Sequence, residues 1–247
     1  MNNIAFYLII FLTNIIQGIT GFAGTILAMP PGLMLVGYDV AKPVLNVLGI
    51  LAGIYVFISQ GKHVNWKELR KVVLVMAVGI FSGIFLKALF ANYESLLYKC
   101  LGAFVLVLAV QGYWKLVRPE KKEKTTRHGA VEVKSYALLV GSGVAHGMFV
   151  SGGPLLISYL SEKIRDKVGF RATISTVWII LNTIILIDDI REGLWTQDLI
   201  VTQMISIPFF AAGMIAGTVL YKRMSQLLFM KLTYILLFIS GITLLVK

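Results

Sequence analysis

Glycines interrupt two apolar stretches of the chain, and these interruptions are its clearest candidates for chemistry. The later stretch, residues 143–160, reads GVAHGMFVSGGPLLISYL and is broken at Ser151-Gly152-Gly153-Pro154. A backbone interrupted inside a bilayer exposes N–H and C=O groups, which are tolerated only where protein or water surrounds them. Gly152-Gly153-Pro154 is typical of a helix start, because proline suits the first turn. Free N–H groups and the positive end of a helix dipole at that start would bind an anion.

A second glycine cluster, Gly18, Gly21 and Gly24, interrupts the first apolar stretch. By comparison with the later break, Gly24-Thr25 is expected to start another helix inside the membrane, from the opposite side. Two helix N-termini facing one another would hold a small anion without a buried lysine. The alternative is that these glycines only allow helices to pack closely, as glycines in membrane helices commonly do.

Polar side chains near the two breaks are further candidates. Lys42 and Arg171 each precede a crossing helix, and both are expected on the pathway or its gate, although Arg171 could instead be a charge that anchors the membrane orientation. His146 could couple anion movement to protons, because histidine titrates near neutral pH, or it could be a packing residue. Pro208 is expected to kink its helix as a hinge. The residues expected to bind substrate are Gly21, Gly24, Thr25, Asn46, Ser151, Gly152, Gly153, Pro154 and Ser175.

The sequence pattern lacks the residue groups that enzymes and metal sites need. Every acidic residue falls in or beside a polar connection, so a cation transporter is disfavoured, because intramembrane carboxylates are the usual cation ligands. There is no HExxH motif, no pair of carboxylates and no Cys-His constellation. The single cysteine, Cys100, is expected to pack as a small apolar residue. We therefore expect no enzymatic activity, no metal and no cofactor.

Composition places these residues in a membrane. Of the 247 residues, 57% are hydrophobic and 14% charged, and the mean hydropathy is +0.83, which is far more apolar than a soluble core needs. The net charge of +11 lies in the short connections, where it would orient a membrane protein, so nucleic acid is not an expected partner. The expected partners are a small anion and the lipid bilayer, and a homodimer is left open. The apolar runs span 4–37, 44–59, 72–92, 96–114, 136–160, 172–187, 199–221 and 227–246.

The distribution of lysine and arginine predicts on which side each connection lies. Connections 61–71, 115–134 and 161–171 hold four, seven and four basic residues, so they are expected in the cytoplasm, whereas the acidic connection 188–198 suits the outside. If run 136–160 crosses the membrane once, ten of the 23 basic residues fall outside; if it returns to its own side, only five do. The broken run is therefore predicted to be a hairpin, with both chain termini outside.

The two halves of the chain match at a nearly constant offset, which indicates an internal duplication. A hairpin plus three crossings is an odd number of passes, so the two copies should be inverted relative to each other. The predicted fold is an all-α polytopic membrane protein with two inverted-topology repeats, each a re-entrant or short broken-helix hairpin plus three transmembrane helices. The predicted domains are a first repeat at 1–117, a basic cytoplasmic linker at 118–134 and a second repeat at 135–247. Matched residues, 129 or 130 positions apart, are Gly18 with Gly147, Gly24 with Gly153, Lys42 with Arg171, and Gly83 with Gly213.

Four motifs follow one another over nearly the whole chain. They are GFAG at 21–24 followed by Pro30, GMFVSGGPLLISYL at 147–160, FRATIS at 170–175, and a late pattern of Pro208, Gly213 and Gly217 followed by basic residues and Ser240-Gly241. In these motifs the chain resembles the sulfite exporter TauE/SafE family, also called the TSUP family of anion permeases.

The resemblance implies export or uptake of sulfite, sulfonates or related sulfur-containing anions. Together with the helix breaks, it predicts a secondary transporter that holds the anion at the hairpin helix N-termini and works by alternating access. The alternatives are a passive anion channel, a membrane-embedded enzyme and a scaffold subunit. We expect the chain in the inner membrane of a prokaryotic cell.

Overall fold

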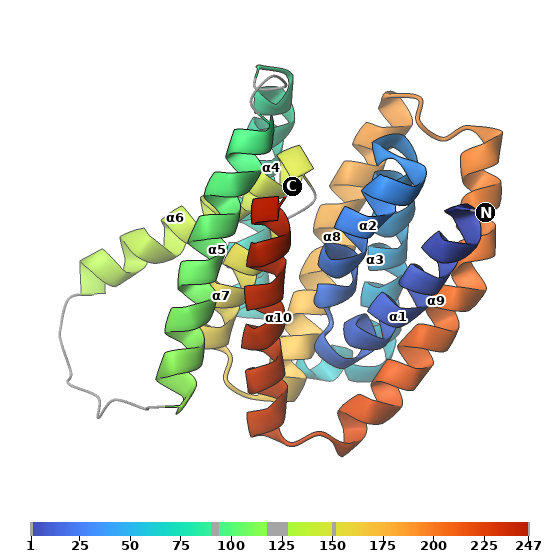
Figure 1. Cartoon of the computed structure of the whole chain (residues 1–247). Coiled ribbons are helices and arrows are strands. Elements are labelled where there is room, and N and C mark those ends of the chain that lie inside the picture. The colour runs from blue at the N-terminus through green and yellow to red at the C-terminus, as the bar shows by residue number, and fades with distance from the viewer. Residues whose placement is uncertain (1, 90–93, 118–127, 150–151, 247) are drawn as a thin grey trace. The chain divides into compact units, whose positions relative to one another are not determined.

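The chain is helical throughout the part that the structure describes. The computed structural model describes residues 2–89, 94–117, 128–149 and 152–246. No strand occurs among these residues, which confirms the all-α prediction. The helices labelled in Figure 1, with one short 3₁₀ turn (η1), are α1 (Asn2–Thr20), α2 (Ala23–Val36), α3 (Tyr38–Gln60), η1 (Gly61–His63), α4 (Trp66–Leu89), α5 (Glu94–Val117), α6 (His128–Phe149), α7 (Gly153–Lys163), α8 (Lys167–Arg191), α9 (Gln197–Arg223) and α10 (Gln226–Val246).

Five helical segments among the described residues are long and apolar enough to cross a membrane. Large apolar side chains such as Phe81 on α4 and Met204 on α9 are exposed, as expected for helices that face lipid rather than water. α2 and α7 have 14 and 11 residues, which is short of the roughly 20 residues that a crossing needs. The five segments are Tyr38–His63, Trp66–Leu86, Lys167–Arg191, Gln197–Arg223 and Gln226–Thr243.

Each of the two glycine-interrupted stretches forms two separate helices. α1 ends at Thr20 and α2 begins at Ala23, with Gly21 between them at a φ of 84°, a left-handed angle that favours glycine. α6 ends at Phe149 and α7 begins at Gly153. α2 packs against α1, and α7 packs against α6. Ser151, one of the predicted substrate contacts, lies outside the described residues.

The chain divides into two compact units. The first unit comprises Met1–Arg70 and Asp166–Phe229, and the second comprises Lys71–Arg165 and Met230–Lys247. The first unit therefore holds α1, α2, α3, α8 and α9, and the second holds α4, α5, α6, α7 and α10. Each unit combines helices from both halves of the sequence.

In the first unit, α3 and α8 pack against each other in opposite directions (Figure 1). Lys42 near the start of α3 meets Asp189 near the end of α8. Asn46 Nδ2 donates to the Asn182 carbonyl oxygen at 3.0 Å. Further along α3, Gly53 packs so closely that a Cβ there would lie 2.6 Å from the Ser175 carbonyl oxygen. As the residue numbers of the contacts rise along α3, those of their partners fall along α8, so the two helices are antiparallel.

Glycines bring α1 and α9 together in the same unit. A Cβ on Gly213 would lie 2.5 Å from the Phe11 carbonyl oxygen, and one on Gly217 would lie 2.1 Å from that of Ile15. A Cβ on Gly18 of α1 would lie 2.8 Å from the Met214 carbonyl oxygen. No other residue type permits this backbone approach, so the packing interpretation of the glycines holds for this contact.

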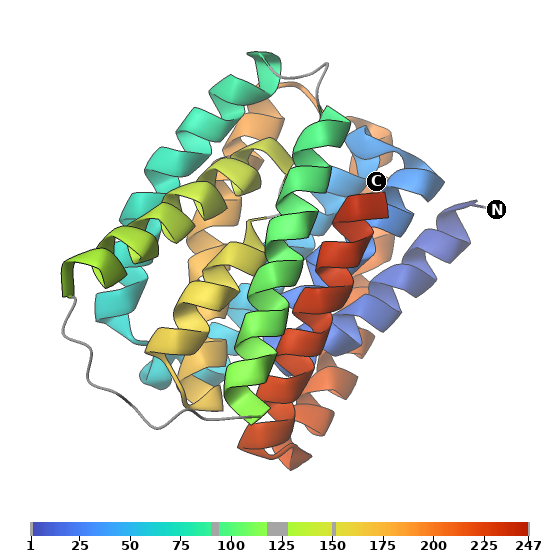
Figure 2. The same cartoon turned by 60° about the vertical axis from the view of Figure 1, so that its left-hand side comes forward.

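The second unit uses the same device between α4 and α6. A Cβ on Gly83 would lie 2.4 Å from the Val144 carbonyl oxygen, and one on Gly147 would lie 2.4 Å from that of Ile80. α5 and α10 also lie side by side in this unit, as Figure 2 shows, and a Cβ on Gly102 would lie 2.8 Å from the Gly241 carbonyl oxygen.

Gly213→Leu is expected to force α1 away from α9 and to destabilise the protein by about 1–3 kcal/mol or more, because overpacking displaces backbone rather than a flexible side chain. The measurement is the melting temperature of the purified protein in detergent. Ala212→Leu is the matched control, since Ala212 is the preceding residue and is exposed. Equal melting temperatures for the two variants would contradict this packing.

Candidate functional site

Arg171 is a fully buried cation near the start of α8. The helix begins at a fixed point, because Asp166 Oδ1 accepts the backbone N–H of Gly169 at 2.6 Å as an N-cap. Arg171 follows about one turn later, and its exposed fraction is 0%. Burial of an arginine side chain is costly unless its charge and its five N–H donors find partners.

Part of the Arg171 guanidinium is used to hold the first unit together. Its Nη2 donates to the carbonyl oxygen of Gly18 at 2.6 Å and to Thr218 Oγ1 at 3.2 Å. Gly18 lies in the last turn of α1, where carbonyl oxygens lack partners within the helix and a cation is favourable. Arg171 Cζ also lies 4.4 Å from the centre of the Tyr221 ring on α9.

The rest of the guanidinium is without a protein partner. Nε and Nη1 of Arg171 are buried and have no hydrogen-bond partner among the described residues. The buried Lys42–Asp189 ion pair does not include Arg171, and no carboxylate among the described residues pairs with Arg171. An anion that accepted a hydrogen bond from Nε or Nη1 would supply the missing charge and a missing acceptor.

The tip of the first hairpin lies against Arg171. A Cβ on Gly21 would lie 2.6 Å from Ser175 Oγ and 3.2 Å from Arg171 Cγ. Ser175 Oγ donates to the Gly21 carbonyl oxygen at 3.3 Å. The structure therefore brings together three of the predicted residues, Gly21, Arg171 and Ser175, at the turn between α1 and α2.

Two backbone donors at the start of α2 are bonded to side chains. The N–H of Ala23 donates to Thr20 Oγ1 at 3.1 Å, and the N–H of Gly24 donates to Gln17 Oε1 at 2.7 Å. In this conformation the donors open to an anion are thus those of Arg171 rather than the N–H of Gly24. Sequence reasoning missed both caps, although a threonine just before a helix start is a recognisable N-cap signal.

Thr25, Asn46 and Asn182 form a polar cluster deeper in the first unit. A Cβ on Gly49 would lie 2.5 Å from Asn182 Nδ2 and 3.6 Å from Thr25 Oγ1. Asn46 and Asn182 each donate from the side-chain amide to the other's carbonyl oxygen, at 3.0 and 3.5 Å. The Asn46–Asn182 bonds link α3 to α8, the helix that carries Arg171, and Thr25 of α2 lies beside them at Gly49.

Lys42, the predicted counterpart of Arg171, is paired. Its Nζ lies 2.6 Å from Asp189 Oδ1, and both side chains are buried. The sequence interpretation placed Asp189 in the acidic connection 188–198; in the structure it belongs to the last turn of α8. The pair fixes the end of α8 against the start of α3.

The second hairpin is closely packed in its own unit. A Cβ on Gly152 would lie 2.1 Å from the Ser142 carbonyl oxygen and 2.7 Å from His146 Cβ. Ser142 Oγ donates to the Gly152 carbonyl oxygen at 2.6 Å. Gly153 and Pro154 begin α7. His146 is buried on α6.

Pro208 lies inside α9, which continues through it from Gln197 to Arg223. Its side chain is exposed, so it does not point into the Arg171 site. Its role as a hinge stays a prediction.

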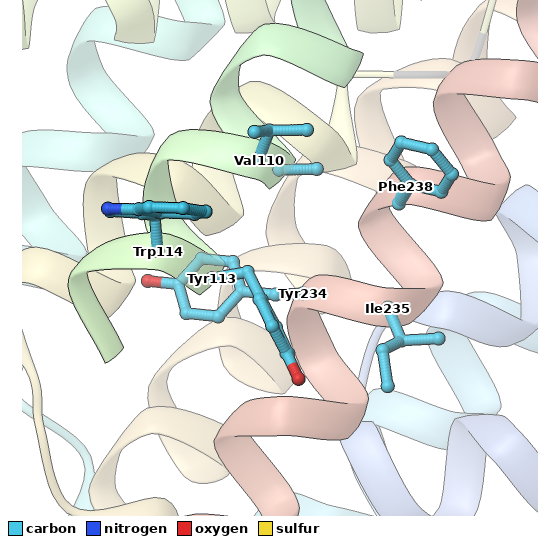
Figure 3. Close-up of a pocket in the computed structure, with 7 residues that line it drawn as sticks. Val110, Tyr113, Trp114, Tyr234, Ile235 and Phe238 are labelled. Atoms are coloured by element: carbon cyan, nitrogen blue, oxygen red, sulfur yellow. The ribbon is translucent and has the colours of Figure 1, made fainter. Parts of the chain in front are cut away.

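The second unit contains an apolar cavity between α5 and α10. Its volume is about 260 Å³, and Tyr113 and Trp114 of α5 and Tyr234 and Phe238 of α10 line it, with Ala109, Val110 and Ile235. Figure 3 shows the aromatic rings arranged around it. No charged side chain lines the cavity, so it is not suited to an anion.

Asp189→Asn is expected to lower the melting temperature strongly, because it leaves Lys42 buried without a counter-charge, at a cost of about 3–5 kcal/mol. The double change Lys42→Met with Asp189→Leu should restore most of the loss, since it removes both charges together. Thermal unfolding in detergent measures all three proteins. A single variant as stable as the parent would show that the pair does not hold α3 to α8.

The sequence agrees with a known family over nearly its whole length. The sequence model of the family described as sulfite exporter TauE/SafE matches residues 6–244. No curated protein and no solved structure matches the chain. The match spans both glycine breaks and Arg171, and the apolar helices are those of a multi-pass membrane protein. The chain therefore belongs to the sulfite exporter TauE/SafE family.

Proposed function

We propose that this protein is a secondary transporter of small sulfur-containing anions such as sulfite or organosulfonates, acting as an exporter or permease. The family supports an anion as substrate. The observation that carries the proposal is the buried Arg171 guanidinium, whose Nε and Nη1 have no partner among the described residues. A buried cation with free donors and no carboxylate suits an anion better than any other solute.

These donors suit an oxyanion. Nε and Nη1 lie on different edges of the guanidinium plane, and each can donate a hydrogen bond to an oxygen of a sulfite or sulfonate group. Ser175 Oγ and the Gly21 backbone lie beside the arginine. The Ser175 hydroxyl donates to the Gly21 carbonyl oxygen in this structure, and it would exchange that bond for one to the anion. In our proposal, the substrate contacts of the first unit are Arg171, Ser175 and the hairpin tip.

Alternating access needs contacts that can open at each end of the pathway. The Lys42–Asp189 pair holds one end of α3 and α8 together, and we assign it the role of a gate. Asn46 and Thr25 would line the path between this pair and Arg171. Ser151, Gly152, Gly153 and Pro154 stay predictions as substrate contacts, as do the roles of His146 and Pro208.

Two packing features support the inverted duplication. α3 and α8 are counterparts in the predicted repeats, and they run in opposite directions. The counterparts of α1 and α9 are α6 and α4, and both pairs pack through glycine: Gly18 and Gly213 in one unit, Gly147 and Gly83 in the other. If the two halves derive from one duplicated unit inserted in opposite orientations, equivalent helices are expected to pack through equivalent glycines, as these two pairs do.

Arg171→Gln is expected to reduce sulfite counterflow into liposomes at least about tenfold, because it removes the charge and the two donor nitrogens that have no protein partner. Arg171→Lys should restore part of it, since lysine keeps the charge without the planar fork. Arg223→Gln, which removes an exposed cation near the end of α9, is the control and should transport normally. Full transport by Arg171→Gln would refute the site.

The same assay separates a carrier from a passive channel. Internal sulfite should accelerate the uptake of labelled sulfite, because a carrier returns faster when loaded. Uptake that does not saturate and shows no acceleration would favour the channel.

Cysteine labelling in a Cys100→Ser background tests the topology. If the second hairpin returns to its own side, Lys62→Cys and Glu162→Cys should label from the cytoplasm and Glu192→Cys from outside. All three residues are exposed. We place both termini outside, the linker 118–134 in the cytoplasm, and the protein in a prokaryotic inner membrane. Labelling of positions 62 and 162 from opposite sides would show that the run crosses once.

A further inference from the structure

We infer that the Arg171 site selects singly charged oxyanions over doubly charged ones, and that Gln60 is the residue that sets this charge preference. The inference rests on the proposed role of Arg171 in anion binding. It adds the charge class of the substrate and a specificity residue on a different helix. It follows from a comparison of the two ends of the α3–α8 pair.

The first step is the register of the two helices. From Lys42 to Gln60 is eighteen positions along α3, and from Asp189 back to Arg171 is eighteen positions along α8. Eighteen residues make about five turns of an α-helix, so each helix presents the same face again. Because the helices are antiparallel, this register places Gln60 opposite Arg171, just as Lys42 lies opposite Asp189.

The second step is the distance between these two levels. Eighteen residues rise about 27 Å, which is close to the roughly 30 Å of hydrocarbon in a bilayer. The two levels are therefore the two ends of the membrane-spanning part of the helix pair. Each end places one cation on this helix face, Lys42 at one and Arg171 at the other.

The third step is the difference between the ends. Asp189 neutralises Lys42, but the residue at the equivalent place opposite Arg171 is Gln60, which has no charge. The surroundings agree with this placement: Gln60 lies near Tyr221, although Gln60 Oε1 and the Tyr221 hydroxyl make no hydrogen bond among the described residues, and the Tyr221 ring lies 4.4 Å from Arg171 Cζ. Replacement of an acid by an amide leaves one buried positive charge uncompensated.

The other charged residues near Arg171 are less buried than Arg171 itself. Lys167 lies one turn before it and is half-buried; its Nζ is directed to the carbonyl oxygen of Met224 and lies 4.9 Å from the centre of the same Tyr221 ring. Asp166, the adjacent residue, is exposed and carries the opposite charge. Lys62 and His63 of η1 are also exposed. Water and salt screen such charges far more than a buried one.

One buried charge determines which anion it can neutralise. A monoanion such as a sulfonate or hydrogensulfite leaves the site neutral. A dianion such as sulfate or sulfite would leave one negative charge in an apolar region, and desolvation of that excess charge is unfavourable. Hydrogen bonding does not distinguish the two anions, since a sulfonate and a sulfate both offer several oxygens to the guanidinium N–H groups. Their charge therefore decides which one binds more tightly.

The test compares methanesulfonate with sulfate by titration calorimetry on the purified protein. We expect methanesulfonate to bind at least about tenfold more tightly. Gln60→Glu should weaken methanesulfonate at least about tenfold, because the new carboxylate neutralises Arg171 as Asp189 neutralises Lys42. Gln60→Met, of similar length and without charge, is the control and should bind methanesulfonate within about threefold of the parent. Gln60→Lys should shift the preference toward sulfate.

The outcomes separate this inference from the proposed function. Equal affinity for both anions, with both lost in Arg171→Gln, would overturn the charge preference while the anion site stands. Methanesulfonate binding unchanged in Gln60→Glu would overturn the assignment of Gln60. No binding of sulfite or either test anion to the parent protein would contradict the proposed function itself. If Gln60→Glu does not fold, the comparison of the two anions on the parent protein still decides the preference.

Discussion

The cost of burying a positive charge away from water is the constraint on which the first unit depends. Two cations lie at opposite ends of α3 and α8, and the protein compensates them in different ways. Lys42 has a carboxylate, that of Asp189. Arg171 has a carbonyl oxygen at the end of α1, a hydroxyl and an aromatic ring, which satisfy one nitrogen and leave two. The ion pair satisfies both of its charges, whereas the partly satisfied guanidinium keeps two nitrogens without a hydrogen-bond partner among the described residues.

The glycines serve this arrangement mainly by letting backbones approach. Gly18, Gly213 and Gly217 set α1 against α9, and only because α1 lies so close can its last carbonyl oxygens reach Arg171. Gly21 has a second role, since its left-handed φ turns the chain between α1 and α2. The two interpretations of the glycines, close packing and an anion site, are therefore compatible, because close packing places the end of α1 against Arg171.

Much of this could be predicted from the sequence, because it depends on local pattern. The apolar runs and the breaks at Gly21 and Gly152 follow from composition and spacing, whereas the equivalence of Lys42 with Arg171, which rests on an internal offset, stays a prediction. The partner of Lys42 could not be predicted, since Asp189 becomes opposite Lys42 only through the register of two helices far apart in sequence. The capping of α2 by Gln17 was equally hidden, because its side chain reaches seven residues along a turn whose shape local pattern does not specify.

In the predicted inverted duplication the two ends of the helix pair begin as chemically equivalent, and the proposed transport requires them to differ. In this chain the change of one side chain from acid to amide, Asp189 at one end and Gln60 at the other, would be enough. The end with the acid can open only by separating a buried ion pair, since a bound monoanion cannot replace Asp189 without leaving the carboxylate unpaired. The end with the amide can exchange an anion with water without breaking any ion pair. Solute binding would therefore be tied to one end of the helix pair and the barrier to opening would be concentrated at the other.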